Sequence, residues 1–302
     1  MSSNIRIIPR LDIKGPHLVK GIHLEGLRVL GKPEQFARYY YENGADELLY
    51  VDVVASLYNR NSLQEIIKKT AREIFIPLTV GGGLRTLEDI RDVLRAGADK
   101  VSLNTAAIKD PQIIKKASRH FGSSAILVTI EAIRQSNGKY LAFTDNGREY
   151  TGVEVLAWAQ QVEKLGAGEI VLTSIDKEGT GHGYDLELTK MVAETVSIPV
   201  IASGGAGKVD HVGKVLSQGK ADAVAVASLL HYDFIKKHQN TFETEKEGNF
   251  EFLKSGRTFL KVESANIQGI KDSLYIKGIG CRYWPNKEIQ DGQKRRIADC
   301  CN

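Results

Sequence analysis

The chain has 302 residues, of which 42% are hydrophobic, and it carries a formal net charge of +4 at pH 7. Lysine and arginine are spread along the sequence, which disfavours nucleic-acid binding and favours small anionic ligands. No segment approaches the roughly 18 apolar residues of a membrane span, and the N-terminus lacks the apolar stretch of a signal peptide. These features argue against membrane and nucleic-acid partners and indicate one large globular domain or two ordinary ones.

The cysteines Cys281, Cys300 and Cys301 lie near the C-terminus, without the spacing of zinc ligands or a histidine partner. This arrangement supports neither a disulfide framework nor a metal site, so we expect a protein of the reducing cytoplasm. We expect no metal and no organic cofactor, because no motif in the sequence indicates one.

Short apolar segments alternate with amphipathic segments along most of the chain. The apolar segments are expected to be strands, over residues 5–11, 47–53, 76–80, 100–104, 125–131, 169–174, 198–203 and 222–228. They are apolar at nearly every position, which is typical of parallel strands buried on both faces. Helices are expected between them, for example over residues 33–44, 62–74 and 86–97. For the last of these, Thr86 and Asp89 form an N-cap signal and Gly97 is a stop signal.

Two regions interrupt this alternation. Residues 134–152 contain two Asn-Gly turn signals around a short apolar run, which predicts a β-hairpin after the fifth strand. Residues 239–262 form a polar insertion, and a last helix is expected over 264–277. The tail 283–302 has no periodicity, and we expect it to be mobile or to wrap around the outside of a domain spanning 1–282.

The sequence also repeats itself. IFIPLTVGGG at 74–83 returns 122 residues later as VSIPVIASGG at 196–205. Together with eight strands and intervening helices, this duplication predicts the α/β class and a (β/α)8 TIM barrel made of two pseudo-symmetric half-barrels, about 1–122 and 123–238, with a C-terminal extension. A doubly wound open sheet is the alternative, but its glycine-rich loop usually follows the first strand. Here that position reads LDIKGPHLVKG.

Two carboxylates occupy matching positions in the two halves. Asp12 ends the first expected strand and Glu131 ends the fifth, so they should face each other across the mouth of an eight-stranded barrel. Such a pair can serve as general acid and general base on one substrate. Either residue alone could be a helix cap or an ion-pair partner of Lys14 or Lys20, but their symmetry favours a functional role.

The glycine pairs are also matched. Each precedes a helix start, and each is followed on the next strand by a pair of short residues, Asn104-Thr105 in one half and Ala227-Ser228 in the other. A single glycine pair could be a tight turn, but two at one offset predict two phosphate sites. The predicted substrate and phosphate ligands are Lys20, Asp52, Gly83, Asn104, Thr105, Thr173, Asp176, Gly179, Ser203, Gly204, Gly205, Ala227 and Ser228.

The segments RLDIKGPHLVKGIHLEGLR, VGGGLRTLED, GADKVSLNTAAI, GAGEIVLTSIDKEGTGHGYD and IPVIASGGAGK resemble the HisF family, the cyclase subunits of imidazole glycerol phosphate synthase. The resemblance covers about residues 5–232 and, weakly, 264–282. It implies an enzyme that takes ammonia from a HisH-like glutaminase at the N-terminal face of the barrel. The ammonia would cleave and cyclise a formimino carboxamide ribotide with a phosphate at each end. The products would be imidazole glycerol phosphate and aminoimidazole carboxamide ribotide.

The resemblance also assigns roles to individual residues. It places Asp12 and Glu131 at the catalytic positions, Lys20 on the substrate-contacting loop, and the two glycine clusters at the phosphates. It implies an ammonia gate at the N-terminal end of the barrel, made of Arg6, Glu47, Lys100 and Glu169. A salt-bridged ring that merely closes the barrel floor is the structural alternative for these four residues.

One departure from the family pattern concerns Glu131, where the family has aspartate; Glu178 likewise stands where aspartate is usual. This change supports an alternative function, a HisF-like subunit that delivers ammonia for amidino-sugar synthesis in a surface-polysaccharide pathway, with a sugar amidotransferase as a further partner. A sugar isomerase of the histidine pathway and a non-catalytic scaffold are further alternatives. The isomerase needs no ammonia gate, and a scaffold leaves the polar strand ends unexplained.

Overall fold

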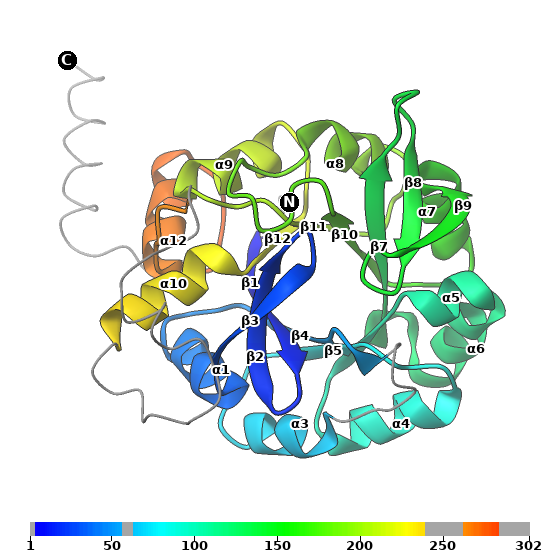
Figure 1. The fold of residues 1–302 in the computed structure, drawn as a ribbon, viewed down its shortest axis with the longest axis horizontal. Coiled ribbons are helices and arrows are strands. Elements are labelled where there is room, and N and C mark those ends of the chain that lie inside the picture. Colours follow the sequence, from blue (N-terminus) through cyan, green and yellow to red (C-terminus); the bar gives the residue numbers. More distant parts are fainter. Residues whose placement is uncertain (1–3, 56–62, 239–261, 284–302) are drawn as a thin grey trace.

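A computed structural model describes residues 4–55, 63–238 and 262–283 of the chain. Eight parallel strands form a closed barrel, in which the last strand pairs with the first (Figure 1). In order around the barrel they are β1 (Arg6–Lys14), β4 (Leu48–Asp52), β5 (Leu78–Gly81), β6 (Lys100–Leu103), β7 (Ile126–Arg134), β10 (Glu169–Ser174), β11 (Val200–Ser203) and β12 (Ala223–Val226). The predicted TIM barrel is therefore confirmed, and the open sheet is excluded.

The helices surround the barrel as an outer layer (Figure 1). They are α1 (Pro33–Glu42), α3 (Gln64–Ala71), α4 (Leu87–Ala96), α5 (Thr105–Lys109), α6 (Gln112–Phe121), α7 (Val155–Lys164), α8 (Leu186–Ala193), α9 (Val209–Ser217), α10 (Ser228–Lys237) and α12 (Ile267–Ile276), with a short 3-10 turn, η1 (Ser123–Ala125). The cap signals of α4 are confirmed: Thr86 and Asp89 form a capping box, and Gly97 ends the helix with a φ of 118°. None of the described helices is long and apolar enough to cross a membrane.

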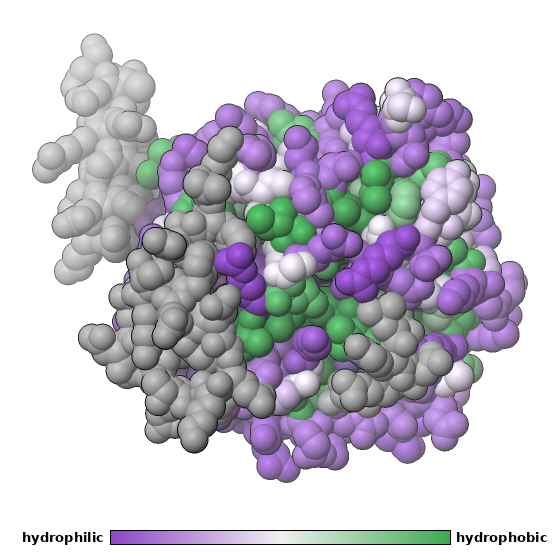
Figure 2. All heavy atoms as spheres, in the orientation of Figure 1, coloured by the Kyte–Doolittle hydropathy of each residue, from purple (hydrophilic) through white to green (hydrophobic). Residues whose placement is uncertain are grey.

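Successive side chains of each strand point to opposite faces of the sheet, so the barrel has two hydrophobic cores. One face of each strand packs against the helices and forms the larger hydrophobic core. The other face points into the barrel, where an apolar layer is built from Ile8, Leu49, Leu127, Val171, Ile201, Ala223 and Ala225. In the space-filling view, hydrophobic residues show toward the centre of the molecule among a surface that is mostly hydrophilic (Figure 2). The polar side chains of the barrel interior therefore lie above and below an apolar middle layer.

Two antiparallel strand pairs extend the barrel at opposite positions. β8 (Tyr140–Thr144) and β9 (Glu149–Glu154) follow β7, which confirms the hairpin predicted over 134–152. β2 (His17–Ile22) and β3 (Glu25–Gly31) follow β1 and were not predicted. The pair β2–β3 crosses the centre of the view in Figure 1. Both pairs place polar residues over the C-terminal ends of the barrel strands.

The last described helix, α12, lies inside the range 264–277 expected for it and packs beside α9. Its buried Lys271 donates hydrogen bonds to Asp46 and to the carbonyl oxygens of Gly44 and Arg282, which ties the helix to the N-terminal side of the barrel. The insertion 239–262 and the tail 283–302 lie outside the described residues, apart from Val262 and Tyr283. The domain limits 1–282 and 283–302, and the half-barrels 1–122 and 123–238, stay predictions.

Candidate active site

Asp12 and Glu131 lie near the C-terminal ends of β1 and β7, which are opposite strands of the barrel. Each side chain points into the mouth and is almost wholly buried, with 2% and 4% of the residue exposed. The positions are equivalent by strand order, but the surroundings of the two carboxyl groups differ. That difference decides which of them holds a proton.

Asp12 is held by two cations. Arg10 Nε donates to Asp12 Oδ1 at 2.9 Å, and Lys20 Nζ donates to Asp12 Oδ2 at 3.4 Å. Burial by itself raises the pKa of a carboxyl group, but the charges of Arg10 and Lys20 outweigh it and hold the Asp12 pKa below its usual range. Asp12 is therefore ionised at neutral pH and is suited to accept a proton.

Lys20 comes from β2 and forms a second, very close ion pair with Glu178, on the loop after β10. Burial lowers the Lys20 pKa, but Glu178 and Asp12 outweigh it and raise the pKa above its ordinary value. Lys20, predicted from the sequence as a substrate ligand, thus lies between Asp12 and Glu178. Glu178 was absent from the predicted ligands, although it is buried and lines a cavity at the mouth.

Glu131 has no ion-pair partner among the residues that the structure describes. Its Oε2 accepts the backbone N–H of Gly147 at 3.0 Å, from the turn between β8 and β9. Burial raises the pKa of Glu131 to about 7, against the opposing effects of the Arg10 charge and the Gly147 amide. A carboxyl group with this pKa carries a proton at neutral pH for much of the time, so Glu131 is suited to donate one.

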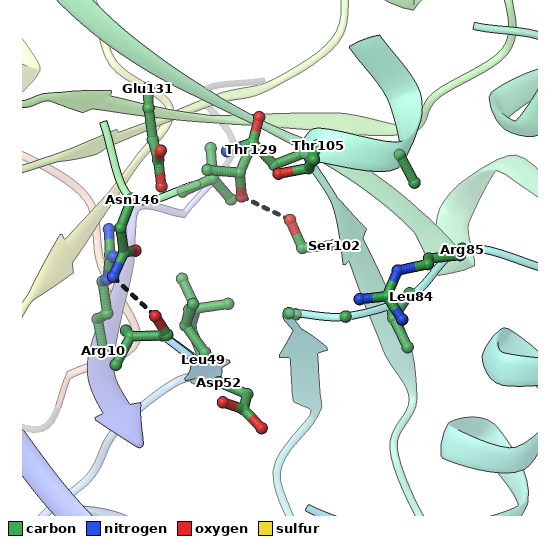
Figure 3. A pocket seen from close by; sticks show the side chains of 18 of the residues that line it. Arg10, Leu49, Asp52, Leu84, Arg85, Ser102, Thr105, Thr129, Glu131 and Asn146 are labelled. Atoms are coloured by element: carbon green, nitrogen blue, oxygen red, sulfur yellow. Dashed lines mark hydrogen bonds between the residues drawn. The ribbon is translucent and has the colours of Figure 1, made fainter. Parts of the chain in front are cut away.

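A cavity of about 180 Å³ opens beside Glu131 at the ends of β4, β5 and β6. Glu131, Asn146 and Arg10 lie along one side of it, and Arg85 lies on the opposite side (Figure 3). It also collects Gly83, Asn104 and Thr105, which the resemblance places at one phosphate, together with Asp52, another of the predicted substrate and phosphate ligands. Arg85 and Lys109 add positive charge to its wall, and the buried Asn104 Oδ1 has no hydrogen-bond partner within the described ranges. The cavity suits a phosphate together with a neighbouring group that donates a hydrogen bond.

A second, smaller cavity lies at the ends of β11 and β12. It is lined by Gly205, Ala227 and Ser228, which the resemblance places at the other phosphate, and by three further predicted substrate and phosphate ligands, Gly179, Ser203 and Gly204. Ala227 and Ser228 begin α10, so the first turn of this helix faces the cavity. Backbone amides at such a position bind anions well. Arg10 lines both cavities and lies between them.

Gly205 has no room for a side chain. Its φ is 104°, and a Cβ atom there would lie 2.1 Å from the carbonyl oxygen of Gly183. We therefore expect Gly205→Ala to displace the loop, to weaken binding of inorganic phosphate at least about tenfold, and to destabilise the fold by about 1–3 kcal/mol. A ³¹P NMR titration and thermal unfolding measure the two effects. Gly138→Ala is the control, because Gly138 also has a positive φ but no atom within 4 Å of the added Cβ. Equal phosphate binding by the two variants would contradict this expectation.

Not every predicted residue joins these cavities. Thr173 lies beneath the mouth, where its hydroxyl accepts a hydrogen bond from Arg10. Asp176 accepts the backbone N–H of Arg134 at 2.9 Å and lines a separate outer depression with Lys177 and Tyr184. The structure therefore does not bring Asp176 together with the other predicted ligands. No cluster of three or more His, Cys, Asp or Glu side chains able to hold a metal ion occurs in residues 4–55, 63–238 and 262–283.

At the other end of the barrel, four charged side chains close the floor in a ring. Arg6 contacts Glu47 at 2.7 Å and Glu169 at 2.8 Å, and Lys100 contacts Glu169 at 2.8 Å and Glu47 at 3.2 Å. Burial raises the pKa of Glu169, but Arg6 and Lys100 outweigh it and hold that pKa below its usual value. The four residues predicted as an ammonia gate thus form one ion-pair network.

The chain is similar in sequence to several known proteins. The family model described as "Histidine biosynthesis protein" matches residues 6–236. The imidazole glycerol phosphate synthase subunit HisF of Legionella pneumophila is 60% identical over 209 residues, which cover 69% of this chain and 99% of the relative. The subunit of the same name from a Nostoc strain is 49% identical over 230 residues, covering 75% of this chain and 89% of the relative. That of Alkaliphilus metalliredigens is 48% identical over 228 residues, covering 76% and 90%. The chain therefore belongs to the HisF family of imidazole glycerol phosphate synthase subunits, as its sequence motifs led us to expect.

Proposed function

We propose that this protein, as the cyclase subunit of an imidazole glycerol phosphate synthase, uses ammonia to cleave and cyclise a bis-phosphorylated formimino carboxamide ribotide. The products are imidazole glycerol phosphate and aminoimidazole carboxamide ribotide. The observation that carries the proposal is the pair of glycine-lined cavities at the barrel mouth, one on each side of Arg10. A ligand with a phosphate at each end fits two such cavities, and its reacting centre then lies near the carboxyl groups between them.

The chemistry assigned to the two carboxyl groups follows from their surroundings. Asp12, ionised between Arg10 and Lys20, accepts a proton from the substrate. Glu131, buried without a cationic partner among the described residues, donates one. An acid and a base of unequal pKa placed across one mouth support the proton transfers of a ring closure. At neutral pH Asp12 is charged, and Glu131, with a pKa of about 7, is protonated in about half of the molecules.

The ion-pair ring at the barrel floor supports the further proposal that ammonia enters there. Arg6, Glu47, Lys100 and Glu169 close the N-terminal end of the barrel, opposite the mouth. We assign to this ring the role of an ammonia gate and to the surrounding face the docking of a HisH-like glutaminase. The relatives are named as subunits of a synthase, which supports a partner chain. The cytoplasm stays our expectation for the location of the complex.

The alternatives raised by Glu131 are less well supported. The relatives compared above are all named as imidazole glycerol phosphate synthase subunits, which does not favour an ammonia-delivering subunit of a polysaccharide pathway or a sugar amidotransferase partner. Those names do not favour the isomerase of the histidine pathway either. A non-catalytic scaffold has no use for a buried carboxyl group whose pKa is raised to about 7.

The proposal is tested by turnover with free ammonia. The purified protein is incubated with the ribotide and an ammonium salt at about pH 8, and both products are followed by mass spectrometry. We expect both products to form at a rate that depends on ammonia, and expect inorganic phosphate at high concentration to inhibit competitively. A folded protein that forms neither product would overturn the proposal. Adding a HisH-like glutaminase should then make the same turnover depend on glutamine.

A further inference from the structure

Arg10 is a buried arginine in the middle of β1. It lies on β1, two residues before Asp12 and on the same face of the strand, and only 2% of it is exposed. It lies between the apolar layer of the barrel and the mouth, where it lines both cavities. It was not among the site residues predicted from the sequence.

The Arg10 guanidinium donates hydrogen bonds to three side chains. Its Nε donates to Asp12 Oδ1 at 2.9 Å, and its Nη1 donates to Thr173 Oγ1 at 3.0 Å and to Ser203 Oγ at 3.1 Å. Thr173 is the last but one residue of β10 and Ser203 is the last residue of β11, and both strands belong to the other half of the chain. The two hydroxyls thus hold the planar guanidinium in one orientation, and the guanidinium in turn holds the carboxylate of Asp12.

A purely structural role explains Arg10 poorly. Burying a charge is costly, and well-packed apolar side chains usually stabilise a core as well or better. The layer directly beneath Arg10 is apolar, with Ile8 on the same strand. An arginine in this place therefore points to a need for its charge at the mouth.

The number of cations at the mouth decides which carboxyl group keeps a proton. The buried cations Arg10 and Lys20 balance Asp12 and Glu178, and both contact Asp12. His231, from α10, also acts on Asp12, but burial lowers its pKa to about 3, so it adds no positive charge at neutral pH. Glu131, from β7, forms an ion pair with neither cation; the Gly147 amide and the Asn104 side chain hydrogen-bond to it. Asp52, Arg85 and Lys109 line the larger cavity beside Glu131. Without Arg10, Lys20 would be the one described cation that forms an ion pair with Asp12.

We propose that Arg10 is a positioning residue that orients the Asp12 carboxylate and keeps it ionised, so that Asp12 acts as the base and Glu131 as the acid. This inference rests on the proposed function for the reaction that the two groups serve. The positive charge of Arg10 keeps the Asp12 carboxylate ionised. Glu131, which has no ion-pair partner among the described residues, is then the carboxyl group that carries the proton. Removing the Arg10 charge should therefore change the protonation of the site more than its shape.

The test compares Arg10→Gln, Arg10→Lys and the wild type. A lost opposite charge at contact distance shifts a carboxyl pKa by about 1–3 units. We expect Arg10→Gln to move the acidic limb of the kcat/KM profile to higher pH by at least about one unit and to lower kcat about 10- to 100-fold. KM should rise less than kcat falls. Arg10→Lys restores the positive charge but not the planar guanidinium with its several N–H donors. The acidic limb of the kcat/KM profile should therefore return toward its wild-type pH, while kcat should recover only in part.

A second measurement needs no turnover. A ¹³C NMR titration of labelled aspartate carboxyl groups, with Asp12 assigned from the Asp12→Asn variant, reports the pKa of Asp12 in each protein. Arg38→Gln is the control, because it removes an exposed arginine that pairs with Glu42 on α1. It should change neither the titration nor the profile. Arg10→Lys also covers the case in which Arg10→Gln does not fold.

The outcomes separate the two proposals. A higher Asp12 pKa in Arg10→Gln, partly reversed in Arg10→Lys, supports the role of Arg10. If Asp12 titrates as in the wild type in both variants, the inference is overturned. If the wild type itself forms no product, the proposed function fails, and the NMR titration still decides whether Arg10 sets the charge of Asp12.

Discussion

Replacing Asp12 with asparagine should lower ammonia-dependent turnover by about 10²- to 10⁴-fold, the usual contribution of one positioned acid or base. The substitution keeps the size of the side chain and removes its ability to accept a proton. Binding of inorganic phosphate should change little, because Asp12 lines neither of the two cavities. Steady-state kinetics with ammonium salt and a ³¹P NMR titration measure the two quantities side by side.

The same substitution should also destabilise the fold. It removes a carboxylate that contacts two buried cations, Arg10 and Lys20, and leaves Glu178 to balance both. Breaking a buried ion pair from one side typically costs about 3–5 kcal/mol, so kinetics are compared well below the midpoint of thermal unfolding. Asp92→Asn, on the exposed face of α4, is the matched control and should change neither turnover nor thermal unfolding. Turnover within about twofold of the wild type would remove Asp12 from the mechanism.

Replacing Glu131 with glutamine should abolish proton donation and change how stability depends on pH. The pKa of Glu131 is about 7 in the folded protein and 4.5 for an unperturbed glutamate. Between these values the folded state holds a proton that the unfolded state has lost, so the stability of the wild type falls as pH rises through 7. Glutamine resembles the protonated form at every pH. From pH 5 to pH 8, the wild type should lose about 2–3 kcal/mol relative to Glu131→Gln.

Turnover of Glu131→Gln should fall about 10²- to 10⁴-fold near neutral pH, and kcat/KM of the wild type should decline above about pH 7 as Glu131 ionises. Glu131→Asp retains a carboxyl group but draws it back from the Gly147 amide, and a misplacement of about 1 Å can cost roughly 100-fold. We therefore expect an intermediate rate from it. Urea titrations and initial rates across pH 5–9 measure these effects. If the free energy of unfolding changes with pH in the same way for the wild type and Glu131→Gln, then Glu131 does not titrate near pH 7.

The barrel could be predicted because its strands are continuous apolar runs and its halves repeat. The pair β2–β3 was missed for a local reason. Its turn is formed by His23 and Leu24, which adopt positive φ angles of 51° and 62° without being glycine or asparagine. The hairpin after β7 was predicted from its Asn-Gly signals. Turn chemistry is visible in a sequence only when the residues that usually provide it are present.

The positions of the main site residues could be predicted from the sequence, but their ion pairs and protonation states could not. Asp12, Glu131 and both glycine pairs follow from strand ends and from the repeat. Arg10 and Glu178 were missed, because burial and pairing across the barrel are set by distant strands. The one available signal was a charge inside an apolar run, the arginine of IIPRL. The opposite states of Asp12 and Glu131 likewise depend on Lys20 from a strand pair that was not predicted.

The ring at the barrel floor is a cycle of contacts in which each cation touches both carboxylates. Breaking one contact, such as that between Lys100 and Glu47, turns the cycle into an open chain in which all four charges still have a partner. Losing a whole side chain instead removes two contacts and leaves an excess charge in a half-buried place, which is costly. The ring therefore tolerates the loss of any one contact without leaving one of its four charges unpaired.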